Sequence, residues 1–187
     1  MANTTIRIAM SAAAALIAAC AQVDKVIPDL AMPRMGPSVP DNLKPPAGER
    51  RYLEAAAKGV QIYECRAGAG GAPAWAFVAP EADLFDINGH ALGRHYAGPT
   101  WELRDGSKTL GAVKERADAP APNSIPWLLL DAKPVGDTGM LGKTTHIQRV
   151  STVGGIAPES GCNAASTGKQ ERVYYTATYF FFTTAPR

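Results

Sequence analysis

The sequence lacks the long apolar run that a membrane-spanning helix needs. Its most apolar stretch, residues 8–19, is shorter than the about 20 residues that cross a hydrocarbon core. The mature chain is therefore expected to have no transmembrane helix. With 46% hydrophobic and 19% charged residues, the composition is otherwise that of a globular protein, and the length suits one domain.

Clusters of basic residues and common catalytic motifs are also missing. The 19 Lys and Arg residues are scattered among 17 Asp and Glu residues, so no nucleic-acid-binding surface is expected. The sequence contains no G-x-S-x-G, H-x-H or H-E-x-x-H pattern, and the segment GAGGAP, residues 68–73, lacks the third glycine of a dinucleotide-binding loop. We expect no cofactor, and a binding module is favoured over an enzyme.

The first residues have the features of an export signal. Arg7 precedes the apolar residues 8–19, and small residues precede Cys20, as in a secretory leader. The segment LIAAC resembles a bacterial lipobox, which predicts a signal peptide over residues 1–19 and a diacylglycerol on Cys20. Ordinary cleavage at the small-x-small segment ACA, residues 19–21, is the alternative. The expected location is the periplasm or the outer membrane as a lipoprotein, and otherwise outside the cell.

Residues 20–49 are rich in proline and show no sustained periodicity. Their six prolines predict an extended tether, which would attach the domain to the membrane through the N-terminal lipid. Its last part, around LKPPAGE, is expected to pack on the domain as an irregular lead-in.

The sequence has three cysteines, which leaves one unpaired in an exported protein. Lipidation of Cys20 would remove the odd one, so Cys65 and Cys162 are the natural disulfide pair in an oxidising compartment. The alternative, a thiol nucleophile at Cys162, is disfavoured because no basic residue lies near it in the sequence to lower its pKa.

Residues 50–187 are predicted to form a single domain of short strands. The dipeptides Asn88-Gly89 and Asp105-Gly106 are typical of hairpin turns, and the alternating segment ERVYYTATYFFFTT favours a central strand. About eight such strands predict an all-β fold, either an antiparallel β-sandwich or a barrel. Only RRYLEAAAKG, residues 50–59, has the propensity for a helical turn, and the strand pattern that follows it competes with that propensity.

Polar and aromatic side chains gather in the stretch GRHYAGPTWELRDGS, residues 93–107. Gly98-Pro99 interrupts any strand there, so the stretch is expected to form a corner. Aromatic faces with a few polar neighbours suit a small molecule or a glycan. The ligand-binding candidates from this corner are His95, Tyr96, Trp101 and Glu102. Trp101 is expected to be more open than Trp75 and Trp127, which lie in apolar segments and are expected in the core.

Arg149 is a further ligand-binding candidate. It interrupts the alternation of HIQRV, which predicts a bulge or an inward-facing charge paired with Glu102 or Asp131.

An extracytoplasmic enzyme or metal-binding protein centred on His95 and Glu102 is the alternative function. His90, His95 and His146 are weak metal candidates whose spacing matches no common ligand pattern, and no metal is expected.

Several segments, taken in order, resemble one known family. LKPPAGE, AAKGVQIYEC, HYAGPTWELRDGS, IPWLLL, IQRVSTVGGIAP and VYYTATYFFF are similar to segments of the bacterial and fungal secreted family called domain of unknown function 3455. The similarity covers about residues 40–182. The resemblance implies no activity, ligand or catalytic residue for this chain.

Lipidation of Cys20 is testable by cell fractionation. Wild-type protein should collect in the membrane fraction, and Cys20→Ser should move it to the soluble fraction, because the variant has no thiol to acylate. The N-terminus of the mature chain provides the control. A soluble wild-type protein that begins at Gln22 would contradict the anchor.

Overall fold

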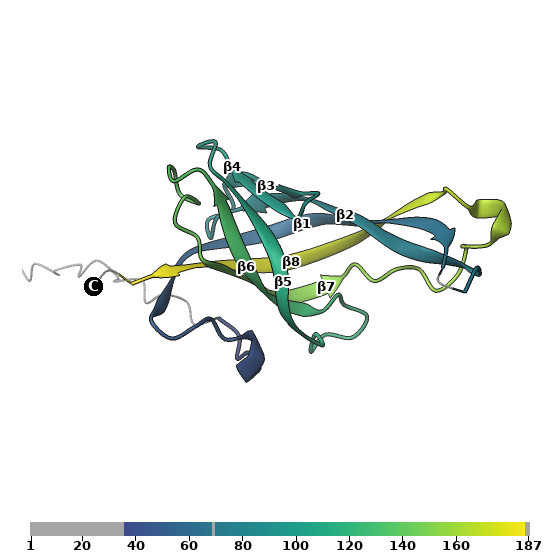
Figure 1. Ribbon diagram of the computed structural model, residues 1–187, viewed down its shortest axis with the longest axis horizontal. Helices are drawn as coiled ribbons and strands as arrows, with labels where there is room; N and C mark the ends of the chain where they lie inside the picture. Colours follow the sequence, from purple (N-terminus) through teal and green to yellow (C-terminus); the bar gives the residue numbers. More distant parts are fainter. Residues whose placement is uncertain (1–35, 69, 186–187) are drawn as a thin grey trace, which may run out of the picture. The chain divides into compact units, whose positions relative to one another are not determined.

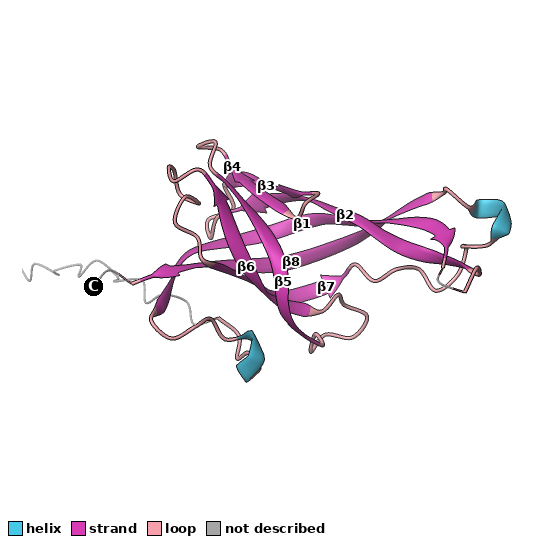
Figure 2. Ribbon diagram, viewed as in Figure 1, coloured by secondary structure: helices cyan, strands magenta, loops and turns pink. Residues whose placement is uncertain are grey.

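The computed structural model describes residues 36–68 and 70–185, and these residues form an all-β fold (Figure 1). The predicted leader, Cys20 and most of the predicted tether lie outside the described residues. Eight strands and two short 3-10 helices make up the described part (Figure 2). The strands are β1 (Glu49–Ala67), β2 (Pro73–Phe85), β3 (Ala91–Tyr96), β4 (Thr100–Leu103), β5 (Lys108–Ala117), β6 (Trp127–Val135), β7 (His146–Gly154) and β8 (Gln170–Thr184), and the helices are η1 (Asp41–Leu43) and η2 (Ala164–Ser166).

The strands form one antiparallel sheet that closes into a barrel. Each strand pairs with the next one along the chain, and β1 pairs with β8 to complete the ring. The all-β prediction is therefore confirmed, with the barrel as the form adopted. Both predicted hairpin turns are present: Gly89 lies between β2 and β3 and Gly106 between β4 and β5, each with the positive φ that such turns require. No helix among the described residues is long and apolar enough to cross a membrane.

Residues 50–59 form part of β1 and not a helical turn. Ala55 and Ala57, with exposed fractions of 0% and 1%, face the barrel interior, where β1 pairs with β2 on one side and β8 on the other. Alanine favours a helix in isolation, but hydrogen bonding to two neighbouring strands and burial of alternate side chains outweigh that small preference.

Two apolar clusters lie on opposite faces of the closed sheet. β8 contributes to both, because Tyr179 and Phe181 pack in the larger interior cluster while Phe180 and Phe182 pack in the second one. The alternation of side chains along an extended strand explains this division. β6 is divided in the same way, which explains why its apolar segment WLLL is buried throughout.

The residues before β1 cover the second cluster. The side chain of Leu43 in η1 is fully buried against Trp127, Leu129 and Val150. The buried Gln148 amide donates a hydrogen bond to the Leu43 carbonyl. The end of the predicted tether, from about Val39 onward, therefore belongs to the packed structure, as expected for a lead-in.

β1, β2 and β8 continue together beyond the shorter strands (Figure 1). At this end Cys65 and Cys162 are paired at disulfide distance, with their Cα atoms 5.3 Å apart. Cys162 lies in the connection between β7 and β8, next to η2. The bridge therefore links β1 to the long connection between β7 and β8, which Tyr63 and Trp75 also hold through hydrogen bonds to the Gly155 and Ser160 carbonyls.

Loss of this bridge should lower stability. The two cysteines are 97 residues apart in the sequence, so the bridge closes a long loop in the unfolded chain. Replacing Cys65 or Cys162 with Ser should lower the free energy of unfolding by roughly 2 to 5 kcal/mol, measured by urea denaturation. A thiol assay on the folded wild-type protein is the control, and two reactive thiols in it would contradict the pairing.

Candidate functional site

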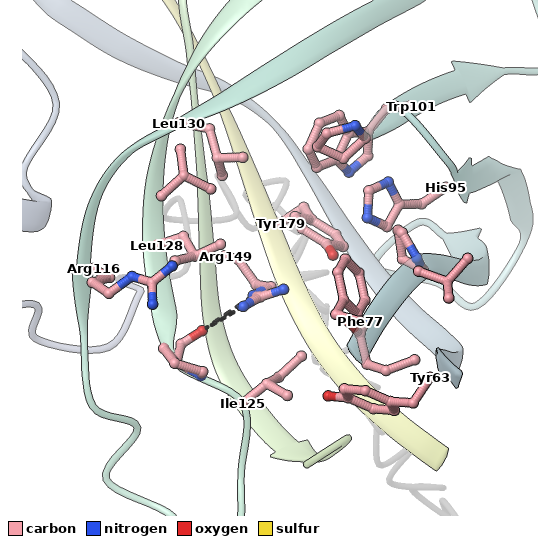
Figure 3. Close-up of a pocket in the computed structure, with 17 residues that line it drawn as sticks. Tyr63, Phe77, His95, Trp101, Arg116, Ile125, Leu128, Leu130, Arg149 and Tyr179 are labelled. Carbon is pink, nitrogen blue, oxygen red and sulfur yellow. Dashed lines mark hydrogen bonds between the residues drawn. The ribbon is translucent and has the colours of Figure 1, made fainter. Parts of the chain in front are cut away.

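A cavity of about 560 Å³ opens into the barrel, and we call it the barrel cavity. Its walls are mostly apolar and aromatic, with a few polar side chains among them (Figure 3). Barrels of eight strands are the size at which the interior is either filled or holds one small ligand. The lining residues are Gln61, Tyr63, Phe77, Val78, Pro80, His95, Gly98, Pro99, Trp101, Val113, Arg116, Ile125, Pro126, Leu128, Leu130, Arg149 and Tyr179.

His95 and Trp101 form one wall of the barrel cavity. They are cross-strand partners on β3 and β4, and their rings stack with centroids 4.3 Å apart. The ring of Tyr179 on β8 packs edge-on against both of them. Trp101 is only 1% exposed and so is less open than the sequence suggested. On β5, Gly111 leaves the space for the indole, because a Cβ there would come within 2.7 Å of the Trp101 ring.

His95 is a neutral imidazole in this environment. Burial lowers its pKa to about 3, because desolvation disfavours the charged form, and the charge of Arg149 adds to this effect. A hydrogen bond of 2.9 Å between Nδ1 and the Thr100 carbonyl acts in the opposite direction. Since a carbonyl only accepts, Nδ1 carries the proton and Nε2 is left as an acceptor. No hydrogen bond among the described residues uses Nε2.

Arg149 on β7 places a guanidinium among the lining side chains. Nε and Nη2 donate to the Pro126 carbonyl at 3.1 and 2.9 Å, the contact that Figure 3 marks. The inward-facing charge was expected, but the expected carboxylate partners lie elsewhere. Asp131 binds Lys114 and His146 on β5 and β7, and Glu102 binds Tyr96 and two cations.

Two buried hydrogen-bond donors in the barrel cavity have no partner. Gln61 Nε2 and Trp101 Nε1 are both inaccessible to solvent and have no partner in hydrogen-bond geometry, although the Gln61 amide is near enough to the Tyr175 hydroxyl to oppose the rise in the pKa of that hydroxyl. Buried polar groups in native proteins nearly always find partners, so each unsatisfied donor calls for an explanation. Sequence reasoning missed Gln61. The signal was present in the alternation of GVQIYEC, which places Gln61 on the same face as Tyr63 and Cys65.

Tyr96 and Glu102 lie on the opposite face of the sheet from His95 and Trp101. They line a charged groove on the outside of the barrel with Lys108, Arg94 and residues of β1 and β2. The Tyr96 hydroxyl donates to Glu102 at 2.7 Å and, with Lys108 and Arg94, lowers the pKa of that carboxyl. The sheet therefore separates His95 from Glu102, and the geometry does not support an acid–base pair between them.

The three histidines lie in different environments. His90 is an exposed turn residue beside Asp86, and His146 is held between Glu49 and Asp131 outside the barrel cavity. Within residues 36–68 and 70–185, no group of three or more His, Cys, Asp or Glu side chains has the arrangement of a metal site.

The remaining tryptophans have different environments. Trp127 is buried in the second cluster, as expected. Trp75 is only partly buried, on the extended part of β2, and its Nε1 donates to the Ser160 carbonyl at 2.9 Å. The expectation of a core role for Trp75 is wrong, because this part of β2 pairs with β1 but lies beyond the residues that pair with β3.

Comparison with known proteins gives one match. The model of a family described as "protein of unknown function (DUF3455)" matches residues 46–183. No curated protein and no solved structure matches the chain. The resemblance found in the sequence is therefore confirmed, and the matched residues contain the whole barrel except Thr184, the last residue of β8.

The pH dependence of stability should report on His95. The pKa of His95 is about 3 in the fold against an ordinary histidine value of 6.5, so below pH 6.5 the unfolded chain binds a proton that the folded chain does not. The stability from neutral His95 is complete above pH 6.5 and is lost progressively as the pH falls toward 3. Between pH 7 and 5 the free energy of unfolding should fall by about 2 kcal/mol more in wild type than in His95→Asn.

Urea denaturation at each pH measures this difference. The other titrating groups are common to both proteins, so they cancel in the comparison. Equal pH dependence in the two proteins would show that the folded chain protonates His95 as easily as the unfolded chain does.

Proposed function

The chain belongs to the DUF3455 family, and we propose that this member is an exported, lipid-anchored module that binds one small, largely apolar molecule in the barrel cavity. The observation that carries the proposal is a cavity of about 560 Å³ inside a closed barrel. Ligand sites in proteins are typically apolar cavities of this order, with a few well-placed polar groups.

The side chains of the cavity wall indicate that the cavity is a ligand site and not a packing defect. An empty apolar cavity destabilises a fold, and selection for stability alone would fill it with larger side chains. Instead the wall includes Phe77, Val78 and Val113, which are 52%, 40% and 49% exposed. Exposed apolar side chains at the mouth of a cavity are typical of a binding surface.

Export and anchoring rest on the sequence of the first residues and on the cysteine pair. The apolar segment 8–19 and the lipobox-like LIAAC support the leader and the lipid. The Cys65–Cys162 pair is consistent with an oxidising compartment, where disulfides persist. A lipid on Cys20 would keep such a binding module at the membrane surface.

Binding can be measured with the neutral, apolar fluorophore N-phenyl-1-naphthylamine. Its fluorescence should rise on addition of the protein and saturate at one molecule per chain. Phe77→Ala should weaken binding by roughly three- to tenfold, because the variant loses part of the apolar mouth.

Tyr174→Ala is the matched control. Tyr174 is also an exposed aromatic residue, 63% accessible on β8, but it does not line the barrel cavity. Its loss should leave the affinity unchanged. Absence of saturable binding by the wild-type protein, or equal losses in the two variants, would contradict a site in the barrel cavity.

A further inference from the structure

We propose that the ligand of the barrel cavity is an amphipathic carboxylate, that is, an apolar body with one carboxylate that binds the Arg149 guanidinium. This inference rests on the proposed function and adds the charge and the polar head group of the ligand. It starts from the charge of Arg149 and from the lack of Asp and Glu among the residues that line the same cavity.

Arg149 has no carboxylate partner among the described residues. Nε and Nη2 donate to the Pro126 carbonyl, and the guanidinium also acts on the Tyr179 hydroxyl, a neutral group that supplies no negative charge. A guanidinium has five N–H donors, so several remain for a ligand. Because arginine does not lose its proton at physiological pH, burial leaves a charge in place. Partly buried charges are normally paired, which makes Arg149 an incomplete ion pair.

The rest of the barrel cavity does not neutralise this charge. No Asp or Glu is among the lining residues, and Arg116 at the rim adds a second guanidinium. The nearby tyrosines stay protonated, since burial raises the pKa of Tyr63 and Tyr179 despite the opposing effect of Arg149. Low pKa values keep Glu102 and Asp131 ionised, but both carboxylates are bound to other cations.

The Arg149 guanidinium sets the chemistry of the ligand's head group, because it is a charged donor that lines the cavity among apolar side chains. A carboxylate accepts several hydrogen bonds and forms planar, bidentate pairs with arginine. An alcohol or an amine offers fewer acceptor sites, and an amine would also be repelled by the guanidinium.

The apolar body of the ligand has a separate surface to bind. Figure 3 shows Arg149 with Leu128 and Arg116 on one side and with Tyr179 and Phe77 on the other. Leu130 and Ile125 extend the apolar wall around it. A ligand that places its carboxylate on Arg149 therefore has apolar side chains around its body, and the cavity selects an amphipathic acid over a small, fully polar anion.

The test compares probes that share one apolar body and differ in charge. Dodecanoate, dodecanol and dodecylamine displace N-phenyl-1-naphthylamine from the wild-type protein at concentrations below their aggregation. Dodecanoate should bind at least tenfold more tightly than dodecanol, a difference of about 1.4 kcal/mol, and dodecylamine should bind most weakly. A parallel pair, 2-naphthoate and 2-naphthalenemethanol, shows whether the preferred body is a chain or a fused ring.

Substitution of Arg149 tests the residue itself. Arg149→Gln should remove the tenfold preference for dodecanoate over dodecanol, because the variant has no positive charge at this position. Arg149→Lys keeps the charge but not the bidentate geometry, so it should retain part of the preference. Arg104→Gln is the matched control: it removes the same charge from the exposed turn between β4 and β5, outside the barrel cavity, and should leave the preference intact.

The outcomes separate this inference from the proposed function. If the neutral fluorophore binds but dodecanoate and dodecanol compete equally, the carboxylate inference is wrong and the binding cavity remains. If Arg104→Gln and Arg149→Gln reduce the preference equally, the effect is one of overall charge and Arg149 is not the anchor. If Arg149→Gln fails to fold, the wild-type comparison of the three dodecyl probes still decides the inference. If no probe binds, the proposed function fails as well.

Discussion

The antiparallel pairing between β1 and β8, which runs from Glu49–Thr184 to Glu64–Gln170, closes the sheet and fixes which side chains face its interior. A closed sheet has no exposed edge, so every strand is hydrogen-bonded on both sides. Closure also gives the alternating strands an inside and an outside. The site follows from that division, because neighbouring residues on one strand, such as His95 and Tyr96, enter different environments.

The interior is filled unevenly, and the barrel cavity is the unfilled part. Large rings, including Trp101, Tyr179 and Phe181, pack together in the interior cluster. Small residues on neighbouring strands, such as Gly111, make room for them. Toward the end where β1 and β2 extend beyond the shorter strands, the lining changes to Gln61, Tyr63 and Phe77. Tyr63 donates a hydrogen bond to the Gly155 carbonyl, whereas the Phe77 ring is exposed at the mouth of the cavity.

Local patterns allowed most of the fold to be predicted from the sequence. Asn88-Gly89 and Asp105-Gly106 predicted turns because short-range backbone conformation decides them, and the alternation of β8 correctly divided its aromatic residues between two faces. Trp75 was misjudged, and the choice between helical turn and strand stayed open for residues 50–59, because both environments depend on strands far away in the sequence. The candidate site was predicted in part, since His95, Trp101 and Arg149 all line the barrel cavity. Glu102 does not line it, because the pairing register of β3 with β4 places Glu102 on the outer face, and no local sequence signal indicated that register.

Burial in the barrel cavity affects the charges of His95 and Arg149 differently. Desolvation acts on both, and for His95 it is relieved by loss of the proton, which leaves a neutral ring bonded to Thr100. Arginine has no such route, because its pKa lies far above physiological pH. The Pro126 carbonyl satisfies two N–H groups of Arg149 but contributes no negative charge. An unpaired guanidinium is costly for the fold alone, and replacing such a charge with an apolar side chain often stabilises a protein. Its position in a cavity without acidic residues therefore argues for a role that stability does not explain, in which the compensating charge comes from outside the chain.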